Sequence, residues 1–194
     1  GSSWITRIYE DKHDNIWIGT GSGISLYNSQ TNTFTGFSLF DENGQQYDTS
    51  IYSIFTDYKD TIWVATDYGL TTVNMDTRRL DLVTSSDPNT NKIMTGSINA
   101  VEVISDEQVW LATYQQGLID FNPKTMEMIA YVIDENNPSI DQIASNKIYD
   151  LTLENDNTLW LAHDKGATKV TLDTMSYTHI QHQAYNPNSI ADNT

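Results

Sequence analysis

The sequence has no cysteine, only four prolines and only ten basic residues among 194. Without cysteine, disulfides, thiolate nucleophiles and cysteine-ligated zinc sites are all excluded. No apolar run reaches about 18 residues, so no segment predicts a membrane-spanning helix. The 26 acidic residues give a formal net charge of −16, and an acidic surface repels phosphate groups. Nucleic acid is therefore excluded as a partner, and an anionic membrane is a poor one.

One phrase occurs four times along the chain, as IWIGT, IWVAT, VWLAT and LWLAH. Its tryptophans are 46, 47 and 50 residues apart: Trp17, Trp63, Trp110 and Trp160. Aliphatic residues stand twelve and nine residues before each tryptophan, beginning with Ile5 and Ile8. A glycine follows six or seven residues after it, at Gly23, Gly69, Gly117 and Gly166. A period of this length indicates a repeat architecture in which each copy is one supersecondary unit.

Each repeat predicts four short strands separated by turns. In the first copy these are residues 5–10, 15–20, 24–28 and 33–38. Asp and Asn in the first turn tolerate a left-handed backbone, and the repeated glycine suits the second hairpin, where φ is positive. The phrase Asn-x-x-Thr in the third turn predicts side chains that bond the local backbone.

The second strand of each repeat is apolar on both faces, as in Ile16-Trp17-Ile18. A sheet with one face in water would alternate instead, so both faces are expected to be covered. Radial stacking of four-stranded sheets does this. The small residues Gly19, Ala65, Ala112 and Ala162 would leave room for a neighbouring blade, and the four tryptophans are interpreted as core. The predicted fold is therefore all-β, a β-propeller segment with four blades of four antiparallel strands.

The polar linkers between repeats set the expected boundaries. Residues 1–3 look like a vector scar, and residues 4–194 are interpreted as a single propeller segment. Its blades span about 4–38, 51–84, 98–133 and 147–182, and residues 183–194 begin the linker to a fifth repeat. We therefore expect the segment to be part of a larger ring of about seven blades, since closed propellers have about 4–8. Other blades are then partners of these four, and two copies could pair through their end blades.

The repeats resemble the two-component regulator propeller. That family reads approximately Asn-Pro-x-Ser-Leu, I-x-x-I-x-x-D, G-x-L-W-I-G-T, then G-L and an aromatic residue. Residues 5–11 with 16–20, and 51–57 with 62–66 and 69–70, match it. The third and fourth copies depart from it at Ile104 and Glu154, where the family has Asp, and the fourth also at His163 and Ala167. The resemblance implies a periplasmic sensor region whose output, a histidine kinase or diguanylate cyclase, lies elsewhere, and carbohydrate as a common ligand class.

No catalytic, metal or cofactor site is predicted. The glycines of residues 19–23 lack the lysine of a phosphate loop and precede no helix. The acidic turns lack the spacing of a calcium loop. His179 and His182 lie three residues apart on a predicted strand and would point to opposite faces.

The loops between the second and third strands are the candidate ligand surface, because they vary between copies while the scaffold repeats. They span residues 20–23, 66–69, 113–117 and 163–166. Side chains in them could stack on a sugar or hydrogen-bond to it: Tyr68, Tyr114, Gln115, His163 and Lys165. Ordinary solvated loop tips are the alternative interpretation.

Three functions remain open from the sequence. The first is an extracytoplasmic ligand-sensing module of a bacterial membrane signalling protein, of the two-component or cyclic-di-GMP type. Its ligand would be an unidentified small molecule, with an oligosaccharide as a candidate. The second is a protein-interaction or adhesion propeller with no small ligand. The third is a catalytic propeller such as a lyase, and we expect instead that the chain itself is not an enzyme.

Overall fold

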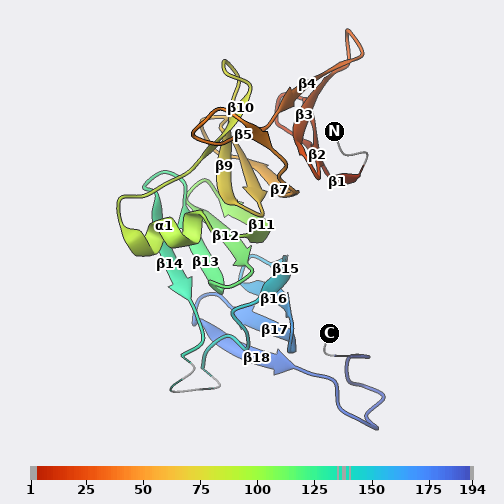
Figure 1. Cartoon of the computed structure of the whole chain (residues 1–194). Coiled ribbons are helices and arrows are strands. Elements are labelled where there is room, and N and C mark those ends of the chain that lie inside the picture. Colours follow the sequence, from red (N-terminus) through yellow and green to blue (C-terminus); the bar gives the residue numbers. More distant parts are fainter. Residues whose placement is uncertain (1–3, 135, 137–138, 140, 193–194) are drawn as a thin grey trace. The chain divides into compact units, whose positions relative to one another are not determined.

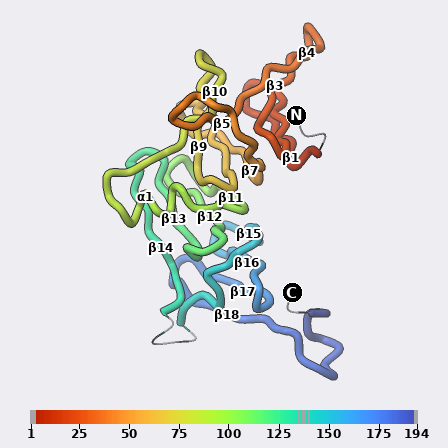
Figure 2. Tube along the Cα trace, viewed as in Figure 1, coloured from red at the N-terminus to blue at the C-terminus, as the bar shows by residue number. Residues whose placement is uncertain are grey.

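The computed structural model describes residues 4–134, 136, 139 and 141–192, so the expected vector scar at 1–3 lies outside the described residues. It contains four four-stranded antiparallel sheets whose strands follow one another in chain order (Figure 1). Figure 2 follows the chain through the same elements. The all-β fold with four antiparallel blades is confirmed.

The strand bounds follow the repeat. Those predicted for the first copy agree with the observed ones to within one residue. Blade one holds β1 (Ile5–Glu10), β2 (Ile16–Thr20), β3 (Gly23–Asn28) and β4 (Thr33–Phe37). Blade two holds β7 (Ile51–Thr56), β8 (Ile62–Thr66), β9 (Gly69–Asn74) and β10 (Arg79–Leu82). Blade three holds β11 (Ile98–Ser105), β12 (Gln108–Thr113), β13 (Leu118–Asn122) and β14 (Glu127–Tyr131). Blade four holds β15 (Ile148–Asn155), β16 (Thr158–His163), β17 (Gly166–Thr171) and β18 (Ser176–Ile180).

The chain forms two compact units, Gly1–Ile98 and Asn99–Thr194. In the first unit, the core joins blades one and two through residues such as Trp17, Ile51 and Ile54. A Cβ atom added to Gly19 would lie 2.7 Å from Ile51 Cγ2. The predicted reason for a small residue at this position, room for the neighbouring blade, is thus confirmed here.

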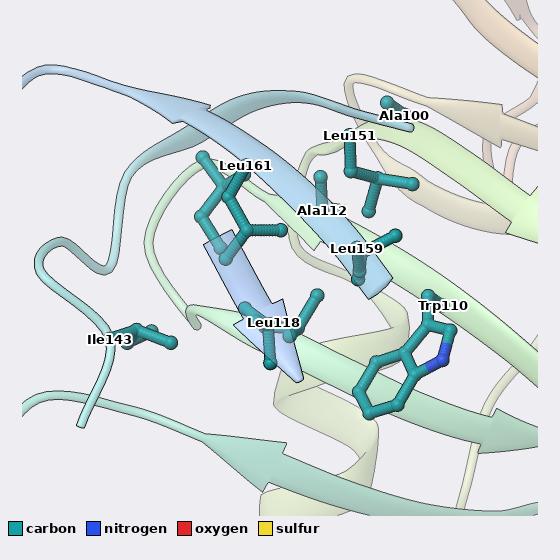
Figure 3. Packing of buried hydrophobic residues seen from close by; sticks show 10 residues of the cluster. Ala100, Trp110, Ala112, Leu118, Ile143, Leu151, Leu159 and Leu161 are labelled. Atoms are coloured by element: carbon teal, nitrogen blue, oxygen red, sulfur yellow. The ribbon is translucent and has the colours of Figure 1, made fainter. Parts of the chain in front are cut away.

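The second unit repeats this packing between blades three and four. Leu151 and Ile148 belong to one buried cluster with Ala112, Trp110 and Leu118 (Figure 3). Ala112 is fully buried and stands two residues after its tryptophan, as Gly19 does. The aliphatic pair of one blade therefore packs on the small residue and tryptophan of the preceding blade in both units.

An aspartate organises the first turn of blades one and two. Asp57 Oδ1 accepts hydrogen bonds from the backbone N–H groups of Lys59 (2.8 Å) and Thr61 (3.0 Å). Its Oδ2 accepts one from Trp63 Nε1 at 3.0 Å. In blade one, Asp11 likewise accepts from the backbone N–H of Asn15 and from the indole of Trp17. One carboxylate therefore both shapes the turn and satisfies a buried indole.

Blades three and four show what happens when this aspartate is replaced. Ile104 cannot accept a hydrogen bond, and among the described residues Trp110 Nε1 is a buried donor with no partner. Glu154 Oε2 does accept from Trp160 Nε1, at 2.8 Å. In both blades only two residues separate the first strand from the second. The departures from the family phrase thus change the turn and the bonding of the indole.

We predict that acid weakens the first unit more than the second. Burial opposes ionisation of Asp11 and Asp57, but hydrogen bonds from the indoles and turn amides outweigh it and lower the pKa of both carboxyls below the ordinary value of 3.8. The stabilisation from such a group is present above the unfolded-state pKa and is lost as pH falls through the folded-state value.

In the second unit, hydrogen bonds from Lys124 and Trp160 lower the pKa of Glu107 and Glu154, but both carboxyls are exposed and solvent weakens these interactions. Burial raises the pKa of Asp120, so protonation there relieves a penalty.

Hydrogen exchange at neutral pH and below pH 3.8 measures this difference between the units. Protection should fall first in Gly1–Ile98 as the pH is lowered. Equal losses of protection in both units would contradict the prediction.

The third turn of blades one, two and three bonds its own backbone as predicted. Asn28 Oδ1 accepts from the N–H groups of Gln30 and Thr31, and Asn74 and Asn122 accept in the same way from Thr77 and Thr125. In every blade the residue before the fourth strand begins has a positive φ: Asn32, Arg78, Met126 and Met175. Three of these four residues, Arg78, Met126 and Met175, are of types that do not favour the left-handed region, so the sequence gives no signal for it there. The surrounding turn and the strand pairing impose the conformation.

Two of the polar linkers between repeats contain regular structure that the repeat pattern does not predict. Residues 86–89 enter α1 (Pro88–Met94), which Asp87 caps by accepting from the N–H of Thr90. Residues 41–44 form the turn between β5 (Leu39–Phe40) and β6 (Gln46–Tyr47). Asp followed by Pro is a known helix start, and the buried Met94 fixes the helix to its unit.

No helix in the described part of the chain is long and apolar enough to cross a membrane.

Candidate functional site

The loops between the second and third strands are closed by the residue that begins them. Thr66 Oγ1 donates to the carbonyl of Gly69 at 2.9 Å and accepts from the N–H of Tyr68 at 3.0 Å. Thr20 and Thr113 make the same pair of bonds in blades one and three. The glycine that ends each loop has a positive φ: Gly23, Gly69, Gly117 and Gly166. The loop backbone is therefore fixed, and its variable side chains project from a rigid frame.

The structure corrects the placement expected for His163. This residue replaces the closing threonine in blade four, and its Nδ1 accepts from the N–H of Lys165 at 3.2 Å. Its Nε2 lies 2.9 Å from Thr168 Oγ1, which in turn lies 3.0 Å from His179 Nδ1. The side chain is only 4% exposed, and burial lowers the pKa of His163. It holds the loop together and does not offer an exposed group to a sugar.

Tyr114 is the aromatic side chain of the blade-three loop. It is 43% exposed, and Lys147 Nζ lies 5.7 Å from the centre of its ring. Gln115 beside it is exposed, whereas Gln116 Oε1 is buried with no hydrogen-bond partner among the described residues. An aromatic face, a cation and amide groups thus meet at one loop, a combination that suits a polar ligand with a flat apolar side.

The linker before β15 connects the loops of blades three and four. The carbonyl of Asn146 accepts from the N–H of Gly117 at 3.1 Å. Its neighbour Ser145 donates to Asp164 Oδ1 in the blade-four loop. Lys165 in that loop is exposed, and Lys147 follows directly after Asn146. The two loops and the linker therefore form one surface in the second unit, called the linker surface below.

Sequence reasoning missed one member of the linker surface, Lys147. This residue lies in a linker that does not repeat, so no column of the repeat could mark it.

Tyr68 belongs to the first unit. Its ring is 44% exposed and meets the Tyr47 ring edge to face at a centroid distance of 5.0 Å. The adjacent Asp67 accepts from Thr49 Oγ1 at 2.7 Å, the counterpart of the bond between Ser145 and Asp164. The same linker-to-loop bond thus occurs in both units.

The remaining histidine pair has separate partners. His179 Nδ1 faces Thr168, whereas His182 Nδ1 lies 2.8 Å from the carbonyl oxygen of Ile190. Within the residues that the structure describes, no group of three or more His, Asp or Glu side chains could hold a metal ion.

The scaffold tryptophans differ in exposure. Trp17, Trp63 and Trp110 are buried, but Trp160 is only half-buried. The indole N–H of Trp160 donates a hydrogen bond to Glu154 Oε2, and Lys169 Nζ lies 5.5 Å from the centre of the Trp160 ring. The face of blade four that carries Trp160 is therefore more open than its equivalents.

Comparisons with solved structures find the same fold. The extracellular domain of the proposed hybrid two-component system BT3049 from B. thetaiotaomicron aligns with a TM-score of 0.74 and 20% identity, over 94% of this chain and 25% of that chain. That of BT4673 from the same organism aligns with a TM-score of 0.72 and 21% identity, over 99% of this chain and 24% of that chain. The chain thus spans about a quarter of the length of these structures.

An inactive variant of virginiamycin B lyase from Staphylococcus aureus also aligns, with a TM-score of 0.63 and 13% identity, over 95% of this chain and 57% of that chain. At this identity the likeness concerns the fold alone. No curated protein matches the sequence. The family model described as two component regulator propeller matches residues 1–22. The predicted resemblance to the two-component regulator propeller family is thus confirmed over these residues.

Proposed function

We propose that the chain is a ligand-sensing part of an extracytoplasmic propeller in a bacterial membrane signalling protein, and that its ligand is a carbohydrate. The observation that carries the proposal is the linker surface, where the exposed Tyr114 ring lies beside Lys147 on a frame fixed by hydrogen bonds. The likeness to extracellular domains of two-component systems supports the location and the signalling role. Catalysis by the chain itself is not part of the proposal.

The geometry favours a sugar over a wholly polar ligand. A sugar ring has an apolar face that can stack on Tyr114, and hydroxyl groups that the exposed amide of Gln115 can bind. Lys147 and Lys165 are cationic side chains on a chain with a net charge of −16. They would attract the carboxylate of an acidic sugar to this surface. Signalling would follow if the bound ligand favoured one arrangement of the receptor over another.

Replacement of Tyr114 by alanine should weaken oligosaccharide binding about tenfold or more, equivalent to about 1.4 kcal/mol. The loss follows from removal of the stacking face, so Tyr114→Phe should bind nearly as well as the original chain. The measurement is calorimetric titration with a panel of neutral and uronate-containing oligosaccharides.

A matched control is available at the other end of a blade. Tyr58, in the turn between β7 and β8, also has a lysine over its ring, with Lys59 Nζ at 5.2 Å from the centroid. Tyr58→Ala should leave binding unchanged. If no oligosaccharide in the panel binds, the carbohydrate proposal fails. A loss in Tyr58→Ala equal to that in Tyr114→Ala would remove the linker surface as its site.

A further inference from the structure

Two tyrosines of the first unit form an aromatic pair at the surface, called the tyrosine pair below. Tyr47 ends the β5–β6 hairpin in the linker between blades one and two, and Tyr68 lies in the loop between β8 and β9. Their rings meet edge to face at 5.0 Å between centroids. Tyr47 packs against the core that joins blades one and two, whereas Tyr68 is 44% exposed. The pair is therefore anchored on one side and open on the other, and it lies on the outer face of neither end blade.

A carboxylate beside the tyrosine pair has one oxygen available to a ligand. Asp67 Oδ1 accepts hydrogen bonds from Thr49 Oγ1 at 2.7 Å and from the N–H of Ser50 at 3.1 Å. These two bonds hold the side chain in place next to Tyr68. Asp67 is exposed, and its Oδ2 has no hydrogen-bond partner among the described residues. The structure thus fixes a charged acceptor beside an exposed ring.

The electrostatic surroundings of Tyr47 are negative. Burial raises the pKa of its hydroxyl, and the neighbouring Tyr68 and the charges of Asp41 and Asp67 raise it further. The two carboxylates therefore lie close enough to act on this ring. A cation placed at the tyrosine pair would be attracted by the same charges.

The chain supplies its own cation to other tyrosine rings, but not to this pair. Lys147 Nζ lies 5.7 Å from the centre of the Tyr114 ring, and Lys59 Nζ lies 5.2 Å from that of Tyr58. In the part of the chain that the structure describes, no basic group lies over either ring of the tyrosine pair. A cation from outside can therefore take the position that a lysine takes elsewhere.

A basic residue does approach the same hairpin, but from its other face. The guanidinium of Arg79 lies 4.4 Å from the centre of the Phe40 ring. Phe40 pairs with Gln46, whereas Tyr47 pairs with Leu39. Successive residues of a strand point to opposite faces, so Arg79 does not occupy the side on which Tyr47 lies.

We propose that the tyrosine pair and Asp67 bind the ammonium group of an amine-bearing ligand. An ammonium group is attracted both to the face of a tyrosine ring and to a carboxylate. A metal ion would need more ligands, and among the described residues no group of three or more His, Asp or Glu side chains could hold one. The site lies in the first unit and the linker surface in the second, so the two sites are separate.

The test is an NMR chemical-shift titration of the chain with a short glucosamine oligomer, at a pH at which its amines are protonated. The N-acetylated form of the same oligomer has the same sugar skeleton without the charge. The glucosamine oligomer should shift the amide signals of Tyr47, Asp67 and Tyr68, and should bind about fivefold or more tightly than the N-acetylated form. Tyr68→Ala should weaken binding about threefold. Asp67→Asn keeps an oxygen for Thr49 and Ser50 and should weaken it by a similar factor.

Three variants serve as controls. Tyr68→Phe keeps the ring, Asp76→Asn removes the same charge from an exposed turn of blade two, and Tyr114→Ala alters the linker surface. All three should bind the glucosamine oligomer as the original chain does, whether or not the linker surface binds carbohydrate. Equal binding of the two oligomers would overturn the proposal, because the charge would not be recognised. Equal losses in Asp67→Asn and Asp76→Asn would also overturn it, because general attraction to the net charge of −16 would then explain the binding. No shift at the tyrosine pair would overturn it as well.

Discussion

Replacing Gly69 by alanine is expected to lower the free energy of unfolding of the first unit by about 3–4 kcal/mol. Two effects add at this position. Its φ is +122°, a conformation that L side chains rarely adopt. A Cβ atom would also lie 2.0 Å from the carbonyl oxygen of Met94 and 2.8 Å from Thr95 Cα. Both neighbours are backbone atoms at the end of α1, so no side chain can rotate to make room.

Gly36 provides the matched control within the same unit. A Cβ atom added there meets nothing within 4 Å, and its φ is not positive. Gly36→Ala should change the free energy of unfolding by no more than about 0.5 kcal/mol. Urea unfolding followed by tryptophan fluorescence gives both values, and hydrogen exchange shows whether α1 loses protection in Gly69→Ala. Equal stabilities of the two variants would contradict the close approach of α1 to β9.

The repeat predicted most of the fold because each blade is a local unit with strong internal signals. Tryptophan spacing, the glycine of the second hairpin and the Asn-x-x-Thr turn are all set within about 45 residues of sequence. The missed elements, α1 and the pair of β5 and β6, lie between repeats, where periodicity gives no information. For α1 the Asp87-Pro88 start signal was present, but its burial through Met94 depends on tertiary contacts.

The candidate site was less predictable, because it depends on which side chains are exposed and on which residues from different segments lie together. His163 differs from the threonine of the other copies, which suggested a ligand group, yet its Nδ1 replaces the threonine oxygen as acceptor in the loop. At this position either a threonine oxygen or a histidine nitrogen can accept the same loop hydrogen bond, so the difference in sequence does not mark a ligand site. Lys147, by contrast, reaches Tyr114 from another segment, and only the folded chain brings the two together.

Replacing Asp57 by alanine is expected to destabilise the first unit by about 3–5 kcal/mol. The buried Trp63 Nε1 loses its carboxylate acceptor, and two turn amides lose theirs. Hydrogen bonds to a charged group contribute about 1.5–3 kcal/mol each, and their losses overlap at one site. Asp57→Asn keeps one acceptor oxygen and should lose less, about 1–2 kcal/mol. Asp76→Ala removes the same charge from an exposed turn and should cost no more than about 0.5 kcal/mol.

Urea unfolding at neutral pH separates the bonding role of Asp57 from its charge. If charge alone mattered, Asp57→Ala and Asp76→Ala would be equally stable, and the proposed role in the turn would be wrong. Blade three shows a different arrangement of the same turn. There Ile104 stands in place of the aspartate, β11 and β12 are joined by two residues, and Trp110 Nε1 has no acceptor among the described residues. Asp57→Ala keeps the longer turn of blade two but removes the carboxylate that orders it. The resulting loss of stability should therefore exceed the cost of the unpaired indole in blade three.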